Sequence, residues 1–138
     1  MATIRFTIPG NQDKDGGNPI PYARTTQAGQ WTERAIRYRA WKNHVVAKYI
    51  DAVRLLKESD RALFGTEKDL TDKKPIPKTK GKVYMHLKIT YCNNAHGDSD
   101  NIFKGIADSL FMDDKYVAGS FDYQYAKEGK VEVEIIIT

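Results

Sequence analysis

Residues 96–114 gather carboxylates, an amide and a lysine into one short stretch that also carries an apolar pattern. The acidic residues of this stretch are Asp98, Asp100, Asp108, Asp113 and Asp114. Clustered like charges are unfavourable without a counter-ion, and carboxylate oxygens are ligands that suit Mg²⁺ or Mn²⁺. A divalent ion held this way activates water and neutralises charge during phosphodiester hydrolysis, and a nearby cation such as Lys104 can stabilise the same charge. The stretch therefore favours a metal-dependent reaction on a phosphodiester.

The apolar residues of this stretch recur at spacings of three and four, which predicts an amphipathic helix over about residues 100–111. Asp100 stands where an N-cap is expected, just before the apolar run. On such a helix Asp100, Lys104 and Asp108 lie along one edge, each a turn apart. Asp98 precedes the helix and Asp114 follows it. We expect the helix to pack beside its flanking strands, so that carboxylates from its two ends meet.

Each of these residues also has an ordinary structural explanation. Asp100 could be only an N-cap, and Asp100 with Lys104 could be a helix ion pair contributing about 0.3–0.5 kcal/mol. Asp113 and Asp114 could form a solvated turn. For any one residue alone the structural explanation is favoured, whereas the whole cluster favours a metal. An EF-hand is excluded because its loop pattern is absent, and the three scattered histidines do not have the spacing of zinc ligands.

At these residues the chain resembles the RusA family of Holliday-junction resolvases, which are endonucleases common in bacterial prophages. The matching pattern is an Asp-x-Asp-Asn-x-x-Lys-x-x-x-Asp run followed by an Asp-Asp pair and a valine, here Asp98, Asp100, Asn101, Lys104, Asp108, Asp113, Asp114 and Val117. The resemblance implies metal-binding catalytic acids at Asp98, Asp100 and Asp114, and a catalytic lysine at Lys104. It implies Mg²⁺ as the cofactor, with Mn²⁺ as a possible substitute, and four-way DNA junctions as the substrate. A junction is two-fold symmetric and needs paired cuts, so a homodimer is expected.

The charge of the chain fits a polyanionic partner. The 138 residues hold 22 lysines and arginines against 18 acidic residues, a net charge of +4, and the acidic cluster leaves the rest more basic. Candidate DNA-binding residues lie in two Pro-containing segments: Arg24, Lys73, Lys74, Lys78 and Lys80. The lysine segment is either a basic arm for DNA or an ordinary solvated loop. The basic residues of the helix expected after Thr32 form either a DNA-binding face or a salt-bridged solvated face.

The single cysteine excludes an internal disulfide and fits a reducing cytoplasm. No long apolar run indicates a membrane span or a signal peptide, so we expect no membrane partner. Together with the resemblance, this predicts a cytoplasmic protein encoded by a bacterium or a phage.

The expected elements are a strand at 3–8, a long loop at 9–30, a helix at 33–57 capped by Thr32, and a charged connection at 59–80. A strand at 82–91 leads to the helix of residues 100–111, and strands at 117–126 and 130–137 form a hairpin around the loop 127–129. This order predicts a single domain over residues 1–138, of class α+β, with helices packed on a mixed β-sheet.

The main function predicted is a Mg²⁺-dependent, structure-selective DNA endonuclease. The alternative is a non-catalytic DNA-binding protein whose acidic cluster holds a structural divalent ion. A lysine between the aspartates argues against the alternative, since a structural site gains little from a cation beside the metal. An RNA-binding module is not favoured, because we recognise no aromatic RNP-type strand in the sequence.

Overall fold

A computed structural model describes residues 1–10, 17–23, 32–65, 75–76, 82–112 and 117–138. In chain order its elements are β1 (Ala2–Pro9), α1 (Glu33–Val53), α2 (Glu58–Phe64), β2 (Val83–Tyr91), α3 (Ser99–Leu110), β3 (Val117–Tyr125) and β4 (Lys130–Ile137). The ends of the elements common to sequence and structure agree to within four residues, and β4 matches at both ends. Thr32 caps α1 as predicted, because its hydroxyl accepts a hydrogen bond from the Ala35 amide at 3.1 Å.

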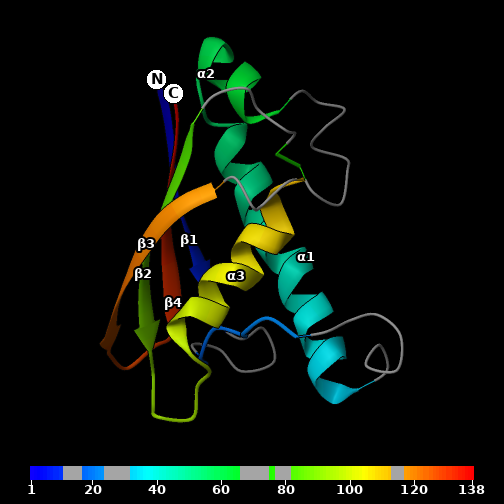
Figure 1. Ribbon diagram of the computed structural model, residues 1–138, viewed down its shortest axis with the longest axis vertical. Coiled ribbons are helices and arrows are strands. Elements are labelled where there is room, and N and C mark those ends of the chain that lie inside the picture. The colour runs from blue at the N-terminus through cyan, green and yellow to red at the C-terminus, as the bar shows by residue number, and fades with distance from the viewer. Residues whose placement is uncertain (11–16, 24–31, 66–74, 77–81, 113–116) are drawn as a thin grey trace.

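The four strands form one mixed sheet in the order β1-β4-β2-β3. β4 pairs antiparallel with both β1 and β2, whereas β2 and β3 run parallel. α1 and α3 cover the same face of this sheet, as Figure 1 shows, and they also pack against each other. The predicted α+β class, with helices packed on a mixed sheet, is confirmed.

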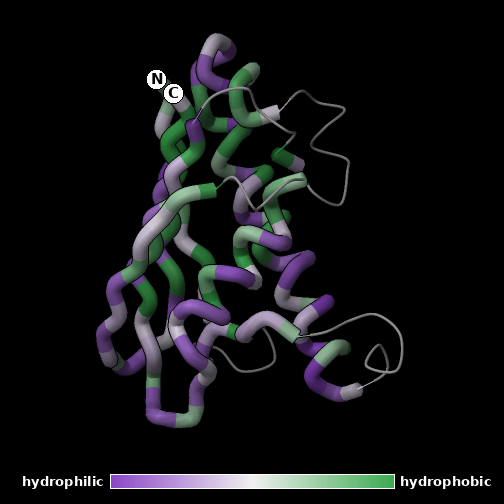
Figure 2. Tube along the Cα trace, viewed as in Figure 1, coloured by the Kyte–Doolittle hydropathy of each residue, from purple (hydrophilic) through white to green (hydrophobic). Residues whose placement is uncertain are grey.

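The core lies between the sheet and the two long helices. Alternate residues of β2 are buried, including Met85, Leu87 and Ile89, and alternate residues of β4 face the same side. α1 contributes a stripe of large side chains, among them Trp41 and Tyr49, which are also fully buried. Figure 2 shows the corresponding alternation of hydrophobic and hydrophilic stretches along the helices. Hydrophobic burial of one helical face and one sheet face therefore orients α3 on the sheet.

The opposite face of the sheet carries polar side chains. On β2 and β3 these include Tyr84, His86 and Ser120, and the Ser120 hydroxyl lies 2.6 Å from the Tyr84 hydroxyl and 2.7 Å from His86 Nδ1. No described helix covers this face (Figure 1). Alternation of apolar and polar residues is the pattern of a sheet with one solvated face.

The predicted hairpin between the last two strands is wrong, because β2 lies between β3 and β4. The chain leaves β3, crosses the end of β2 and enters β4; the Ala126 amide donates to the Tyr91 carbonyl at 3.0 Å at this crossing. The four residues 126–129 can span the two strand spacings involved, roughly 10 Å. A short loop between two strands therefore did not establish that they pair. α3 instead connects β2 to its parallel neighbour β3, as parallel strands require a crossover.

The predicted single helix over residues 33–57 is wrong at its end. α1 stops at Val53, and a second helix, α2, occupies part of the segment expected to be a charged connection. α2 is fixed by its last residue, because the buried Phe64 joins the core and its carbonyl accepts a hydrogen bond from the Tyr49 hydroxyl. Tertiary packing decides the structure of this short polar segment, which has little apolar periodicity of its own.

The described residues contain no helix with the length and apolar character needed to cross a membrane.

We predict that Gly119→Ala destabilises the protein by roughly 1–3 kcal/mol, the usual cost of overpacking. An added Cβ would lie 2.3 Å from the Met85 carbonyl oxygen and 2.4 Å from Phe103 Cζ, so β3 could not keep its distance from β2 and α3. Chemical denaturation measures the change. Ala118→Ser, at an exposed site on the other face of β3, is the control and should change stability by less than about 0.5 kcal/mol. Equal stabilities for the two variants would contradict the packing described.

Candidate metal and phosphate site at the start of α3

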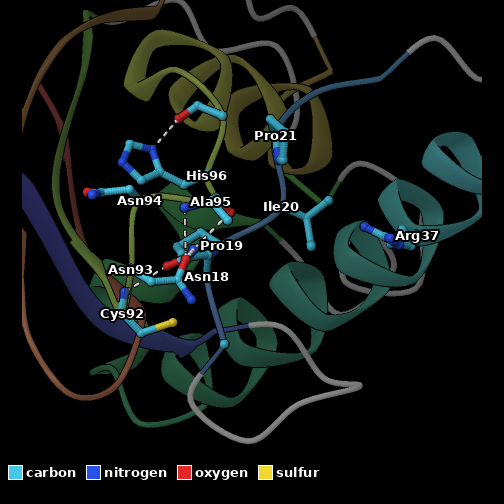
Figure 3. A pocket seen from close by; sticks show the side chains of 12 residues that line it. Asn18, Pro19, Ile20, Pro21, Arg37, Cys92, Asn93, Asn94, Ala95 and His96 are labelled. Carbon is cyan, nitrogen blue, oxygen red and sulfur yellow. Dashed lines mark hydrogen bonds between the residues drawn. The ribbon is translucent and has the colours of Figure 1, made fainter.

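A loop of residues 92–97 carries the chain from β2 to α3, and Asn18 holds this loop in place. The Asn18 side chain accepts a hydrogen bond from the Cys92 amide at 2.7 Å. Its amide nitrogen donates to the Asn93 side chain at 2.8 Å and to the Ala95 carbonyl at 3.0 Å. Figure 3 shows Asn18 lying among the three residues that it binds. One side chain thus fixes the approach to α3 from a segment more than seventy positions earlier in the sequence.

The 17–21 segment and the 92–97 loop border a cavity of about 530 Å³. Gly97 closes one side of it against Pro21, so tightly that a Cβ on Gly97 would lie 2.8 Å from the proline ring. Arg37 of α1 lines the other side (Figure 3), where its guanidinium binds Glu33 at 3.2 Å. The cavity therefore opens next to the start of α3 and has a cationic side chain in its wall.

Asp98 and Asp100 both lie at the beginning of α3, but their roles differ from the prediction. Asp98, not Asp100, is the N-cap: its carbonyl accepts hydrogen bonds from the Asn101 and Ile102 amides, each at 3.1 Å. The Asp98 side chain makes no capping bond, while Asp100 accepts a hydrogen bond from the Asn101 amide at 3.0 Å. Both side chains are exposed. They stand at the positive end of the helix dipole, which stabilises negative charge there.

Lys104 lies one turn beyond Asp100 and is also exposed. Its Nζ atom lies 4.2 Å from the centroid of the Tyr22 ring, a cation–π contact. Tyr22 is in turn fixed to α3, because its amide donates to the Asn101 carbonyl at 3.1 Å. The 17–23 segment therefore holds the lysine side chain against Tyr22, one turn beyond Asp100.

Asp108 has a structural role that the sequence did not reveal. Its Oδ2 atom accepts a hydrogen bond from the Tyr38 hydroxyl at 2.7 Å and forms an ion pair with Lys42 at 3.1 Å. Burial of Tyr38, reinforced by the Asp108 carboxylate, raises the pKa of its hydroxyl, which therefore stays protonated and keeps donating. Asp108 thus joins α3 to α1. Lys42 and Arg37, both in ion pairs, fit the salt-bridged alternative for α1 better than a free basic face.

Several predicted site residues lie outside the described residues, namely Arg24, Lys73, Lys74, Lys78, Lys80, Asp113 and Asp114. The described residues nearest to Asp114 are Met112 and Val117. Met112 donates to Ile76 beyond the last turn of α3, and Val117 pairs with Val83 at the start of β2. Both lie at the end of α3 away from Asp98. The structure therefore places Asp98, Asp100 and Lys104 within the first two turns of α3 and gives no position for Asp114. The described residues do not support the expectation that carboxylates from the two ends of this helix meet.

Asp98 and Asp100 could provide two carboxylate ligands for Mg²⁺. Among the described residues, no group of three or more His, Cys, Asp and Glu side chains is placed to hold a metal ion. Mg²⁺ does not require such a cage, because it keeps several waters and commonly binds one or two carboxylates together with phosphate oxygens of the substrate. Two exposed carboxylates with hard oxygen donors match that requirement.

Aromatic side chains gather next to this site, and the sequence prediction missed them. His96 stacks on Tyr91 with 3.5 Å between ring centroids, and its Nε2 atom lies 2.8 Å from the Tyr125 hydroxyl. Tyr91 shares a hydrogen bond with Ser99 at 2.8 Å, and burial raises its pKa. Phe121, Tyr123 and Tyr125 recur at every second position, which could have indicated one aromatic strand face. That these rings remain exposed follows from the edge position of β3, which the sequence did not predict.

No protein-family model matches this chain, and a search of curated proteins finds no significantly similar sequence.

We predict that Tyr38→Phe lowers the free energy of unfolding by roughly 1.5–3 kcal/mol, as expected for a lost hydrogen bond to a charged group. The change leaves the ring in place but removes a hydrogen-bond donor from the half-buried Asp108 carboxylate, which keeps its ion pair with Lys42. Thermal or urea unfolding measures it. Tyr84→Phe removes a hydroxyl that is hydrogen-bonded at an exposed site, and its effect should be clearly smaller. If the two substitutions cost the same, Asp108 does not join the helices as described.

Proposed function

We propose that this protein is a Mg²⁺-dependent, structure-selective DNA endonuclease that resolves four-way junctions by phosphodiester hydrolysis. One observation carries the proposal: the charged residues of a single motif differ in exposure and in their contacts. Asp108 is used in packing, whereas Asp98, Asp100 and Lys104 are exposed and, within the described residues, form no ion pair. Exposed charged residues are common on protein surfaces, so the support comes from their shared position at the start of α3, next to the cavity lined by His96 and Gly97.

Each exposed residue has a role in the proposed reaction. Asp98 and Asp100 would hold the ion, whereas Asp114 is not included as a ligand, because Met112 and Val117 on either side of it lie at the opposite end of α3. Bound Mg²⁺ would supply Lewis-acid activation of water and of the scissile phosphate. Lys104, fixed over Tyr22, would stabilise the negative charge that grows on the phosphate or on the leaving oxygen.

The cationic side chains around the site offer positions for neighbouring phosphates. Arg37 lines the cavity and Lys104 lies beside Tyr22, so both border the 17–23 segment, which leads directly to Arg24. We propose that DNA backbones contact this side of the molecule. Lys73, Lys74, Lys78 and Lys80 stay proposed DNA contacts on the strength of the sequence alone. Since a junction is two-fold symmetric, the proposal includes a homodimer that makes paired cuts.

The alternative function is a non-catalytic DNA-binding protein with a structural ion. A structural ion contributes most when its ligands are drawn from several elements and shielded from water. Asp98 and Asp100 are instead exposed, lie two residues apart, and stand beside a lysine that opposes cation binding. These observations favour the enzyme, and a cleavage assay with Mg²⁺ against EDTA separates the two functions.

We predict that Asp100→Asn abolishes cleavage of a labelled four-way junction in Mg²⁺, while binding of the junction in EDTA is retained or becomes tighter. The amide is a poor Mg²⁺ ligand, and loss of the negative charge removes repulsion of the phosphates. Gel assays of cleavage and fluorescence anisotropy of binding measure the two effects.

The matched control is Asp51→Asn, an exposed aspartate on α1, which should cleave at the wild-type rate. A linear duplex of equal length is the substrate control and should be cut much more slowly than the junction. Wild-type cleavage by Asp100→Asn would show that the metal does not bind at the start of α3.

We predict that Lys104→Ala lowers the rate of cleavage by on the order of 10²–10³, with a much smaller effect on junction affinity. The reason is that a fixed cation acts mainly on the charge that develops in the transition state. Single-turnover kinetics at saturating protein separates rate from affinity, and Lys57→Ala, which removes an exposed lysine from the start of α2, is the control. A large loss of affinity at an unchanged rate would make Lys104 a phosphate-binding residue only.

A further inference from the structure

β3 presents three aromatic side chains on the face of the sheet that carries the helices. Phe121, Tyr123 and Tyr125 are 39%, 62% and 52% exposed, although their partners in β2 are buried. The difference arises because β3 is the edge strand and α3 covers only its first part: Phe103 contacts Phe121 at 6.4 Å between centroids, and the later rings lie beyond this contact. We call Phe121, Tyr123 and Tyr125 the aromatic row.

The aromatic row leads directly to the carboxylates at the start of α3. Its last residue, Tyr125, is hydrogen-bonded to His96, which stacks on Tyr91. Tyr91 is in turn hydrogen-bonded to Ser99, the residue between Asp98 and Asp100. A continuous set of contacts therefore joins the row to the site where the metal is proposed.

The two sides of α3 differ in charge. Phe103 faces β3 and Lys104, the next residue, faces Tyr22 and α1. The β3 residues on the helix-bearing face are Val117, Gly119 and the aromatic row, none of which is charged. An anionic phosphate is therefore favoured on the lysine side, whereas the aromatic side, next to two carboxylates, suits a planar and uncharged group. This division matches the two parts of a nucleotide.

We propose that the aromatic row is a stacking surface for an unpaired base of the DNA substrate, placed beside the phosphate bound at the start of α3. This proposal rests on the proposed function. Stacking of a base on an aromatic side chain is tolerant of sequence and typically changes affinity by roughly 5- to 150-fold per base. Bases inside a linear duplex are already stacked on one another, whereas a branch point can offer a free one. The row thus gives the site a means of preferring branched DNA without reading its sequence.

Tyr123 is the best position for a test, because it is the most exposed ring of the row and its contacts are with other rings. The probe is a fluorescently labelled four-way junction with one unpaired adenine at the branch point, bound in EDTA so that no cleavage occurs. Tyr123→Leu should weaken binding by about 10-fold, while Tyr123→Phe, which keeps the ring, should bind like the wild type. Tyr84→Leu, on the opposite face of the sheet, is the control and should have no effect.

A second junction, with an abasic residue in place of the adenine, isolates the role of the base. On this junction the wild type and Tyr123→Leu should bind equally. If Tyr123→Leu weakens both junctions alike, or neither, the stacking proposal is wrong. Sedimentation of the same proteins tests whether a second copy of the chain covers the aromatic row instead. If Tyr123→Leu dissociates a dimer, the row is a contact between two copies and the stacking proposal is wrong.

The outcomes for the two proposals can be told apart. Base-dependent binding without cleavage in Mg²⁺ would refute the nuclease and leave the stacking surface standing. Cleavage by the wild type together with base-independent binding would support the nuclease and refute the stacking surface.

Discussion

The hydrogen bond between Tyr38 and Asp108 joins α3 to α1, and the candidate site depends on the position of α3. Hydrophobic burial of its apolar face determines which side of α3 meets the sheet. The buried hydroxyl and the ion pair with Lys42 hold one edge of the helix against α1. With that edge fixed, Asp100 and Lys104 are left at the surface, on the side next to the 17–23 segment.

The 17–23 segment lies against the loop of residues 92–97 and the start of α3, although it is distant from both in the sequence. Asn18 holds the loop before α3, and Tyr22 holds Lys104 and binds the Asn101 carbonyl. Residues 17–23 contain no helix or strand. Hydrogen bonds hold them near each end of the segment, through the Asn18 side chain and the Tyr22 backbone amide. The N-terminal segment therefore acts as a wall of the site, which explains why an irregular stretch packs so closely that Gly97 has no room for a side chain beside Pro21.

The sequence predicted what depends on local periodicity and failed where tertiary contacts decide. Alternation identified β2, and the spacing of Ile102, Ile106 and Leu110 identified α3 to within one residue at each end. The N-cap was placed at Asp100 instead of Asp98, because both are good caps and only the backbone path chooses between them. The position of β3 at the edge was not predictable from a three-residue loop. Nor could the sequence separate Asp108, whose partners come from a distant helix, from the exposed aspartates.

The position of β4 in the sheet has a consequence for how the chain folds during synthesis. β4 follows every other described element in the sequence, yet it lies between β1 and β2 and pairs with both. β1 and β2 therefore cannot join one sheet until β4 has been synthesised, which is roughly 6–26 s after β1 at about 5–20 residues per second. During that interval the β2-α3-β3 unit can form from neighbouring segments, whereas β1 has no strand with which to pair. The nascent chain thus exposes β1 as an unpaired hydrophobic strand until β4 pairs with it.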